Sequence, residues 1–484
     1  MKPHYLRIRK VKIHSASTAI QVGFYQGKRF KLSKHIGSSK DQKKILELTG
    51  VANEYIRSHN PQTEFNFNPQ SEEILFKRGL KISESYLQEA YDYLSRVYSK
   101  VGFHRIGSDV LKHFTVIRVL EPTSKSKSIV LLGKYFGIFY KKTTVFRVLP
   151  GLTPFKDEAI RIAVKYAKDN LNFDFSLVFY DVITLYFETD KADDFRKNGF
   201  SKDNKINQPQ ILIGLVVNNT GFPVYYDIFE GNTFEGKTII PVILEIRRKY
   251  RIHKFTVVAD AGMLSRGNLD ELEKHNLDYV VGGRIGNMNL EDIRIIASKL
   301  NRTDKKIIRK DTMLYEYSGK RALKDKADND RQIKKAEYYL DNPAKVFKRS
   351  KFLSTRDKKT FKLNTSLVEK YRLLEGIKGY KTNITNMSEE LLISRCKDLW
   401  KIEQSFRMAK SDLEARPIYH RKKNSIEYHI LIVFMALCMG RVIEMEKGES
   451  IRKVMDGLKD KWTILLKDEI SGNSVKLLLD KIPH

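Results

Sequence analysis

Three acidic residues lie at positions where a carboxylate suggests a specific function. Asp181 is in the middle of the apolar run 175–187, where an ionised carboxylate is costly unless it is paired or binds a metal ion. Asp260 ends the apolar segment 254–259 and precedes a glycine turn, a place where α/β sheets bind ligands. With Glu403 they form an oxygen-rich set that suits Mg²⁺, or Mn²⁺ in its place.

The chemistry that such a set could perform is displacement at a phosphodiester. Two metal ions can activate the attacking oxygen and stabilise the leaving oxygen. If the strands of Asp181 and Asp260 are neighbours, their carboxylates meet at the centre of a sheet, and a helix beside them can add Glu403. Structural roles remain open: a hydrogen-bonded turn or edge position for Asp181, and a helix N-cap for Asp260.

Glu403 belongs to a stretch of good helix formers, residues 396–410. Lys410 follows it by about two turns and shares its face, and Arg407 lies one turn away. This spacing predicts that Lys410 holds a substrate phosphate near the metal ions. An exposed helix with a Glu403–Arg407 ion pair explains the same spacing. The predicted buried stripe of this helix contains Ile402, Phe406 and Ala409.

Composition points to a globular protein with a polyanionic partner. The 484 residues are 41% hydrophobic and carry a net charge of +31. A surplus this large favours nucleic acid as the partner, although a basic surface without a specific partner is the alternative. Cys396 and Cys438 are too few for a disulfide framework, and residues 1–7 lack the apolar core of a signal peptide. The apolar run 430–439 is too short to span a bilayer, so we expect a cytoplasmic, nucleoid-associated protein.

The N-terminal third is predicted to be a small α+β region followed by helices. Segments 18–25 and 29–32 favour a hairpin, 39–58 a helix and 61–72 a polar linker. Helical spacing then dominates, and the predicted helices are 84–100, 106–120, 124–136, 142–149 and 155–170.

Two of these short helices, 124–136 and 142–149, are basic and resemble a DNA-binding helical pair. An ordinary helical hairpin explains the pattern equally well. The basic residues are Lys125, Lys127, Lys134, Lys141, Lys142 and Arg147.

An α/β pattern begins near residue 173. Strands are predicted at 175–187, 210–218, 223–230, 254–259 and 277–282, with helices at 237–250 and 265–275. A tight turn at 219–221 makes the second and third strands antiparallel. Lysine-rich residues 287–375 look inserted, a strand returns at 379–384, the helix of Glu403 begins near Ser388, and the remainder is predicted to be helical to residue 484. The predicted domains are 1–72, 73–172, 173–286, 287–378, 379–440 and 441–484.

Residues 231–238 match the nucleotide-binding pattern G-x-x-x-x-G-K-T, with a strand before it and a helix after it. An ATPase acting on nucleic acid is therefore an alternative. Glu230 and Glu235 would repel incoming phosphates, and an antiparallel hairpin does not suit a parallel P-loop core. The competing interpretation makes Lys237 a helix-start or DNA-contact lysine.

The order Asp181, Asp260, Glu403 resembles the DDE transposases of bacterial insertion sequences, in the branch with a large insertion before the last acid. The motifs that carry this resemblance span nearly the whole chain; they are 5–7, 35–38, 221–223, 229–233, 258–265, 400–403 and 416–420. The resemblance implies a ribonuclease-H-like α/β core with a mixed insertion, an α+β N-terminal DNA-binding region and a helical C-terminal part. It also implies Mg²⁺-dependent cutting at terminal inverted repeats, joining to target DNA, and a homodimer on paired ends. It assigns Asp181, Asp260 and Glu403 to the metal ions and Lys410 to DNA.

Two departures from the branch pattern are visible. The signature tyrosine and arginine fall on Cys396 and Leu399, so Lys397 or Arg407 must supply the phosphate contact, or it is missing. No tryptophan lies in the insertion to stack on a flipped base, which leaves a hairpin intermediate open; the tyrosines that could replace it are Tyr315, Tyr317, Tyr338 and Tyr339. A DNA-binding protein that kept the fold but lost cutting is the third alternative.

Overall fold

The structure is a computed structural model. It describes residues 6–13, 17–27, 29–59, 80–189, 191–199, 207–252, 255–260, 265–342, 350–355, 361–416, 418, 420–468 and 473–480. The chain divides into two compact units, one of residues 1–80 with 468–472 and one of residues 81–467 with 473–484. The predicted linker 61–72 and the motif residues 261–264, Pro417 and Tyr419 lie outside the described residues.

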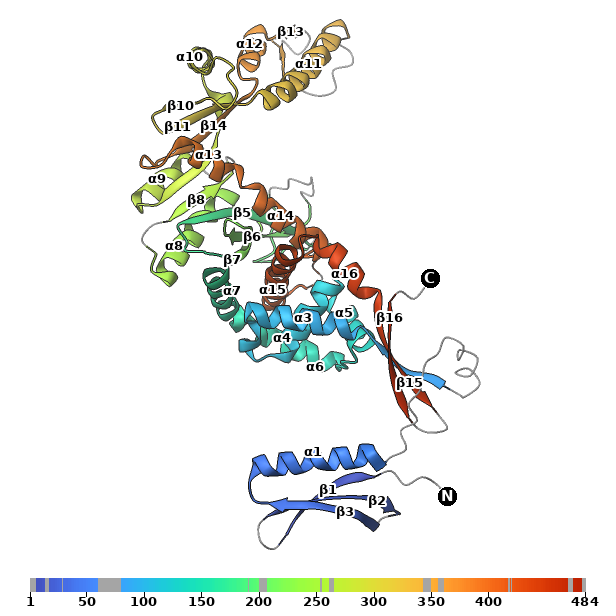
Figure 1. The fold of residues 1–484 in the computed structure, drawn as a ribbon. Helices are drawn as coiled ribbons and strands as arrows, with labels where there is room; N and C mark the ends of the chain where they lie inside the picture. The colour runs from blue at the N-terminus through green and yellow to red at the C-terminus, as the bar shows by residue number, and fades with distance from the viewer. Residues whose placement is uncertain are drawn as a thin grey trace. The chain divides into compact units, whose positions relative to one another are not determined.

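The first unit contains a three-stranded antiparallel sheet and one helix (Figure 1). The strands are β1 (Arg7–Lys12), β2 (Thr18–Gln26) and β3 (Arg29–Ser39), and the helix is α1 (Gln42–His59). Ile20, Val22 and Ala52 form its buried core, because alternate residues of β2 face the helix. The predicted hairpin and helix are confirmed.

Helices open the second unit. They are α3 (Gln88–Val101), η2 (Phe103–Ile106), α4 (Asp109–Leu120), α5 (Lys125–Phe136), α6 (Lys142–Val148), η3 (Leu149–Phe155) and α7 (Lys156–Asn170). Ser108 and Ser124 cap α4 and α5 by accepting hydrogen bonds from main-chain N–H groups three residues on. Left-handed glycines end α3 and α5, at Gly102 and Gly137. The five helices predicted here are confirmed, with shifts of a few residues at their ends.

An eight-stranded mixed sheet follows, in the order β10-β11-β14-β9-β8-β5-β6-β7. Its strands are β5 (Leu177–Tyr186), β6 (Gln210–Val217), β7 (Pro223–Glu230), β8 (Thr256–Ala259), β9 (Asp278–Gly283), β10 (Ile307–Lys310), β11 (Met313–Tyr317) and β14 (Ile377–Thr382). β5, β6 and β7 are antiparallel neighbours, whereas β5, β8 and β9 run parallel. The predicted antiparallel β6–β7 pair is confirmed.

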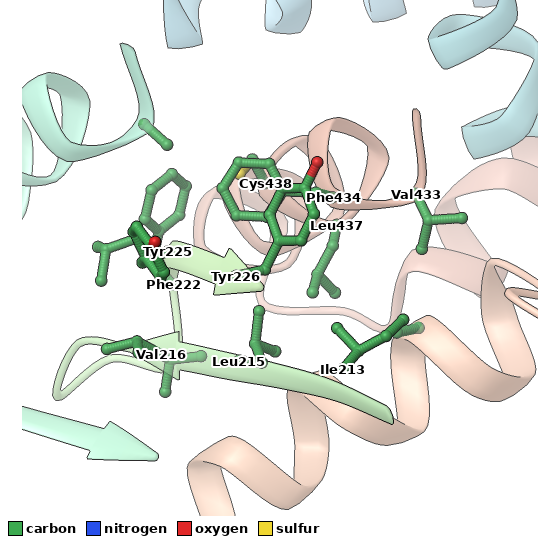
Figure 2. Packing of buried hydrophobic residues seen from close by; sticks show 14 of the residues in the cluster. Ile213, Leu215, Val216, Phe222, Tyr225, Tyr226, Val433, Phe434, Leu437 and Cys438 are labelled. Carbon is green, nitrogen blue, oxygen red and sulfur yellow. The ribbon is translucent and has the colours of Figure 1, made fainter. Parts of the chain in front are cut away.

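Helices cover the sheet. They are η4 (Glu235–Lys237), α8 (Ile239–Tyr250), α9 (Arg266–Lys274), α13 (Glu389–Lys397), α14 (Trp400–Arg407) and α15 (Lys423–Lys447). Figure 2 shows side chains of α15 packed against β6 and β7, and the rings of Tyr226 and Phe434 have centroids 4.8 Å apart. Among the described residues, α15 alone is long and apolar enough to cross a membrane, yet 94% of its apolar window is buried in this core.

The inserted segment is partly continuous with the sheet. It contains η5 (Ile285–Asn287), α10 (Leu290–Leu300), α11 (Gly319–Asp341), α12 (Thr365–Leu373), and a small sheet of β12 (Leu353–Thr355) and β13 (Phe361–Leu363). β10 and β11, however, extend the main sheet beyond β14. Tyr315 and Tyr317 of β11 are buried with Ile377, which removes them as base-stacking residues.

The C-terminal end differs from the prediction. α16 (Ile451–Lys459) is helical, but β15 (Lys461–Asp468) and β16 (Ser474–Asp480) form a sheet with β4 (Leu80–Tyr86). The prediction of a helical end was therefore wrong for these two strands. β15 lies between β16 and β4, and β4 is far away along the sequence, so local patterns do not show this pairing.

Candidate active site

The register of β5 and β8, continued by two residues, brings Asp181 level with Asp260. Parallel β5 and β8 pair Leu177 with Thr256 and Phe179 with Val258. Two residues further along each strand are Asp181 and Asp260, at the point where β8 ends. Adjacent strands lie about 4.8 Å apart, and residues in register on parallel strands point to the same face. β5 and β8 are neighbours, which is the condition under which the sequence predicts that the two carboxylates meet; that they do so stays a prediction.

Asp181 lies on the face of the sheet opposite α8. Tyr180, the neighbour of Asp181, donates a hydrogen bond from its hydroxyl to Oγ1 of Thr238 at the start of α8, at 2.7 Å. Because successive strand residues point to opposite faces, Asp181 points away from α8. Oδ1 of Asp181 accepts a hydrogen bond of 2.8 Å from the N–H of Val182. α13 packs on β8 and β9, and α14 packs on β5.

The helix of Glu403 is broken in a way that the sequence did not show. α13 ends at Lys397 and α14 begins at Trp400, so the predicted single helix is two helices. Burial, with a further contribution from the charge of Asp260, raises the pKa of the Cys396 thiol at the end of α13 to about 11. Glu403 is exposed on α14, while the predicted stripe of Ile402, Phe406 and Ala409 is buried.

A polar clamp holds α14 against the β6–β7 turn. Oγ of Ser405, fully buried on α14, donates a hydrogen bond to the carbonyl of Gly221 at 2.6 Å. The guanidinium of Arg441 on α15 donates to the carbonyl of Thr220 at 2.8 Å and to Glu444 at 2.6 Å. Gly221 has a φ of +78°, so the turn requires glycine. The clamp fixes the helix that presents Glu403.

The donor set suits a hard cation, but the acids are not gathered into a metal-binding cluster. No group of three His, Cys, Asp or Glu side chains in the described part of the chain is close enough to hold a metal ion. Two carboxylates at neighbouring strands and a third on a helix in contact with β5 are oxygen ligands of the kind that Mg²⁺ takes. Joint binding of one metal ion would therefore require the three acids to come closer together.

The basic residues predicted around Glu403 have different surroundings. Arg407 is exposed, and Lys410 is half-buried in the π-helical turn η7 (Met408–Asp412). Such turns occur frequently at functional sites. Lys397 forms an ion pair of 2.6 Å with Glu316, a residue of β11 that is only 7% exposed. Its ammonium group therefore already has a buried partner.

Lys237 lies in a loop that is built differently from a phosphate cradle. β7, which precedes it, is an antiparallel edge strand. Asn268 donates a hydrogen bond to the carbonyl of Gly236, and Thr238 donates to the carbonyl of Glu235, both at 2.6 Å. The threonine hydroxyl that would bind Mg²⁺ in an ATPase thus serves the packing of α8. Lys237 itself is exposed at the start of that helix.

The basic helical pair contains both exposed and buried cations. Lys141, which precedes α6, and Arg147 within α6 are exposed, so they can contact DNA. Lys125 is buried at the start of α5, with Nζ 3.3 Å from Nδ1 of His429. Trp400, which the sequence prediction left without a role near the site, is 56% exposed one turn before Glu403. A tryptophan one turn before the candidate ligand Glu403 was the sequence feature that could have indicated a base-stacking residue at the site.

Comparisons with known proteins assign the class. The family described as the transposase DDE domain matches residues 176–439, which is more than half of the chain. The chain therefore belongs to the DDE transposase family, whose domain cuts and transfers DNA strands and generally depends on divalent metal ions.

Two solved structures are similar to the chain. One is a piggyBac transposase synaptic complex with hairpin DNA, at 13% identity and a TM-score of 0.33, covering 77% of this chain and 70% of that one. The other is a Mos1 transposase paired-end complex with the left transposon end, at 13% identity and a TM-score of 0.16, covering 39% of this chain and 57% of that one. A search of curated proteins gives no match.

Proposed function

We propose that this transposase cuts and joins DNA at terminal inverted repeats of an insertion sequence, with Asp181, Asp260 and Glu403 holding the divalent ions. The observation that carries the proposal is the β5–β8 register, which, continued by two residues, supports a common face for the two aspartates, together with the contact of α14 with β5. Mg²⁺ bound there supplies activation of an attacking water or 3′-hydroxyl and stabilisation of the leaving oxygen. Lys410 and Arg407, beyond Glu403 on the same chain segment, orient the substrate phosphate.

The proposed architecture follows the order of elements. Antiparallel β5–β7 joined in parallel to β8 and β9, with α14 in contact with β5, support our assignment of a ribonuclease-H-like core. We assign residues 1–72 and 73–172 to DNA binding, with Lys141 and Arg147 as contacts. Residues 287–378 are the insertion within the core 173–286 and 379–440. The enzyme acts as a homodimer on paired ends, within the cytoplasm.

Cleavage of end-containing DNA in Mg²⁺ tests the proposal. Replacing a residue that supports a metal ligand typically lowers metal affinity or activity by ~10- to 100-fold. Replacing a ligand itself should lower activity at least as much, so Asp181→Asn should abolish cutting while DNA binding persists. Asp227→Asn is the matched control. Asp227 also lies in this sheet and also accepts from the next N–H, at 3.0 Å, but it pairs with Lys156 at 2.6 Å.

Three outcomes separate the alternatives. Loss of cutting in Asp181→Asn but not in Asp227→Asn supports the transposase. ATP hydrolysis that is lost in Lys237→Ala would show that the chain acts as an ATPase and not as a transposase. DNA binding without either activity, in the unmodified chain and in Mg²⁺ or Mn²⁺, would leave the non-catalytic DNA-binding protein.

A further inference from the structure

A cavity of about 540 Å³ lies outside the candidate active site. It is formed where the start of α5 meets α4, α15 and the segment that follows η7. Its walls include Lys125, Arg118, His420 and His429, with Glu414 also contributing. Every one of these residues belongs to the second unit. The cavity is therefore a feature of one compact part of the chain.

The ammonium group of Lys125 is buried there and has one hydrogen-bond partner among the described residues. Lys125 is 4% exposed, and its Nζ faces Nδ1 of His429 at 3.3 Å. Nε2 of His429 faces the carbonyl of Ala415 at 3.1 Å, so the imidazole is assigned as neutral with its proton on Nε2. Nδ1 then accepts one of the three N–H groups of Lys125. Burial lowers the pKa of both side chains well below their usual values.

Arg118 adds a second buried cation whose partners are neutral. Its guanidinium donates to the carbonyls of Glu414 at 3.1 Å and Thr123 at 2.8 Å. Burial lowers the pKa of Arg118 to about 10, although the Glu414 carboxylate opposes that shift. Within the described ranges no ion pair joins Arg118 or Lys125 to a carboxylate. Buried cations whose direct hydrogen-bond partners are neutral are costly, so this cavity favours an anion.

The first turn of α5 presents main-chain N–H groups that can bind an anion. α5 is 12 residues long, and its first intrahelical bond runs from the N–H of Ser128 to the carbonyl of Ser124. Ser124 Oγ accepts from the N–H of Lys127, and the N–H groups of Lys125 and Ser126 precede the helical bonds. Groups at this position, with the helix dipole, attract phosphate.

We propose that this cavity binds a phosphate group, held by the ammonium of Lys125 and the first N–H groups of α5. A strand of DNA or a small phosphate compound could supply the group. The choice of DNA rests on the proposed function, because the segment lining the cavity begins two residues after η7, the turn that carries Lys410. A phosphate held there would connect the position of a DNA strand to the active-site helix.

Calorimetric titration of the full chain with inorganic phosphate, at constant ionic strength, tests the site. Lys125→Met removes the buried charge, and Lys134→Met removes an exposed charge from the last turn of the same helix. Because a charge-assisted hydrogen bond contributes about 1.5–3 kcal/mol, Lys125→Met should weaken phosphate binding by about tenfold or more. Lys134→Met should bind as the unmodified chain does.

A second variant keeps the test decisive if Lys125→Met does not fold. Ser126→Asp places a carboxylate at the helix start, where it should stabilise the fold and exclude phosphate. Equal phosphate affinity in all four proteins, or a response that chloride reproduces, would overturn the site. Competition by 5′-phosphorylated DNA identifies DNA as the source, and its absence identifies a small phosphate compound. Asp181→Asn should bind phosphate normally, so failure of catalysis and failure of this site are distinguishable.

Discussion

At the scale of single residues, Lys397 shows that a basic residue near the active site can have a structural partner. Its position beside Cys396 makes it a candidate for the missing phosphate contact. In the structure it neutralises Glu316, which also receives a hydrogen bond of 3.3 Å from the hydroxyl of Tyr380. The ion pair joins α13 to β11, so it connects the helices of the active site to the inserted strands.

Lys397→Met should therefore destabilise the protein more than it weakens DNA binding. Breaking a fully buried pair costs about 3–5 kcal/mol, and since Lys397 is half exposed we expect about 1–3 kcal/mol here. Denaturant unfolding measures the loss. The double variant Lys397→Met with Glu316→Gln removes both charges and should recover most of it. A Lys397→Met protein of normal stability with weakened DNA binding would instead make Lys397 a phosphate contact.

At the scale of elements, the clamp on α14 determines how Glu403 is presented. A Cβ on Gly221 would lie 3.0 Å from the carbonyl oxygen of Lys401 and 3.1 Å from Nη2 of Arg441. Both atoms belong to elements that the clamp joins, so a side chain there pushes α14 and α15 away from the turn. The position of Glu403 therefore depends on Gly221, a residue without a reactive side chain.

Gly221→Ala should impair cleavage and stability together. The left-handed conformation alone costs a non-glycine residue about 1–2 kcal/mol, and displacement of α14 should lower the cleavage rate further. Gly457→Ala is the control, because Gly457 lies in α16 with no atom within 4 Å of its added Cβ. It should stabilise the helix by about 0.5–1 kcal/mol and leave cleavage unchanged. Normal cleavage by Gly221→Ala would show that the clamp does not position Glu403.

Sequence patterns predicted the elements whose stability is local and missed those that depend on distant partners. The apolar runs before Asp181 and Asp260 were sufficient to predict two strands, whereas their adjacency was only a condition of the site, and β5 and β8 are adjacent. The break at residues 398–399 was missed because both halves consist of good helix formers. The burial of Lys125, a predicted DNA contact, was missed because helical spacing alone does not show that α15 covers this side chain with His429.

At the scale of the whole molecule, the net charge of +31 should dominate DNA affinity. Each neutralised phosphate releases counterions, so affinity falls with salt in proportion to the number of contacts. Fluorescence anisotropy at 50 and 200 mM salt should show a loss of about 10³- to 10⁵-fold if about 6–10 phosphates are contacted. Lys141→Met should reduce the slope by about one, whereas Lys274→Met, which removes a lysine already paired with Glu271 at 3.1 Å, should not. Affinity independent of salt would contradict a backbone-binding surface.

The path of the chain through the sheet has one more consequence. β9 and β14 are antiparallel neighbours, with Gly283 opposite Gly379, so the polypeptide leaves for the excursion of nearly a hundred residues and returns at the same place. A short connection would be enough to join β9 to β14. Because the entropy cost of closing a loop grows only slowly with its length, the insertion between them can become longer or shorter, or be exchanged, during evolution at a small cost in stability. The reaction centre and the accessory module can thus diverge at separate rates within one gene.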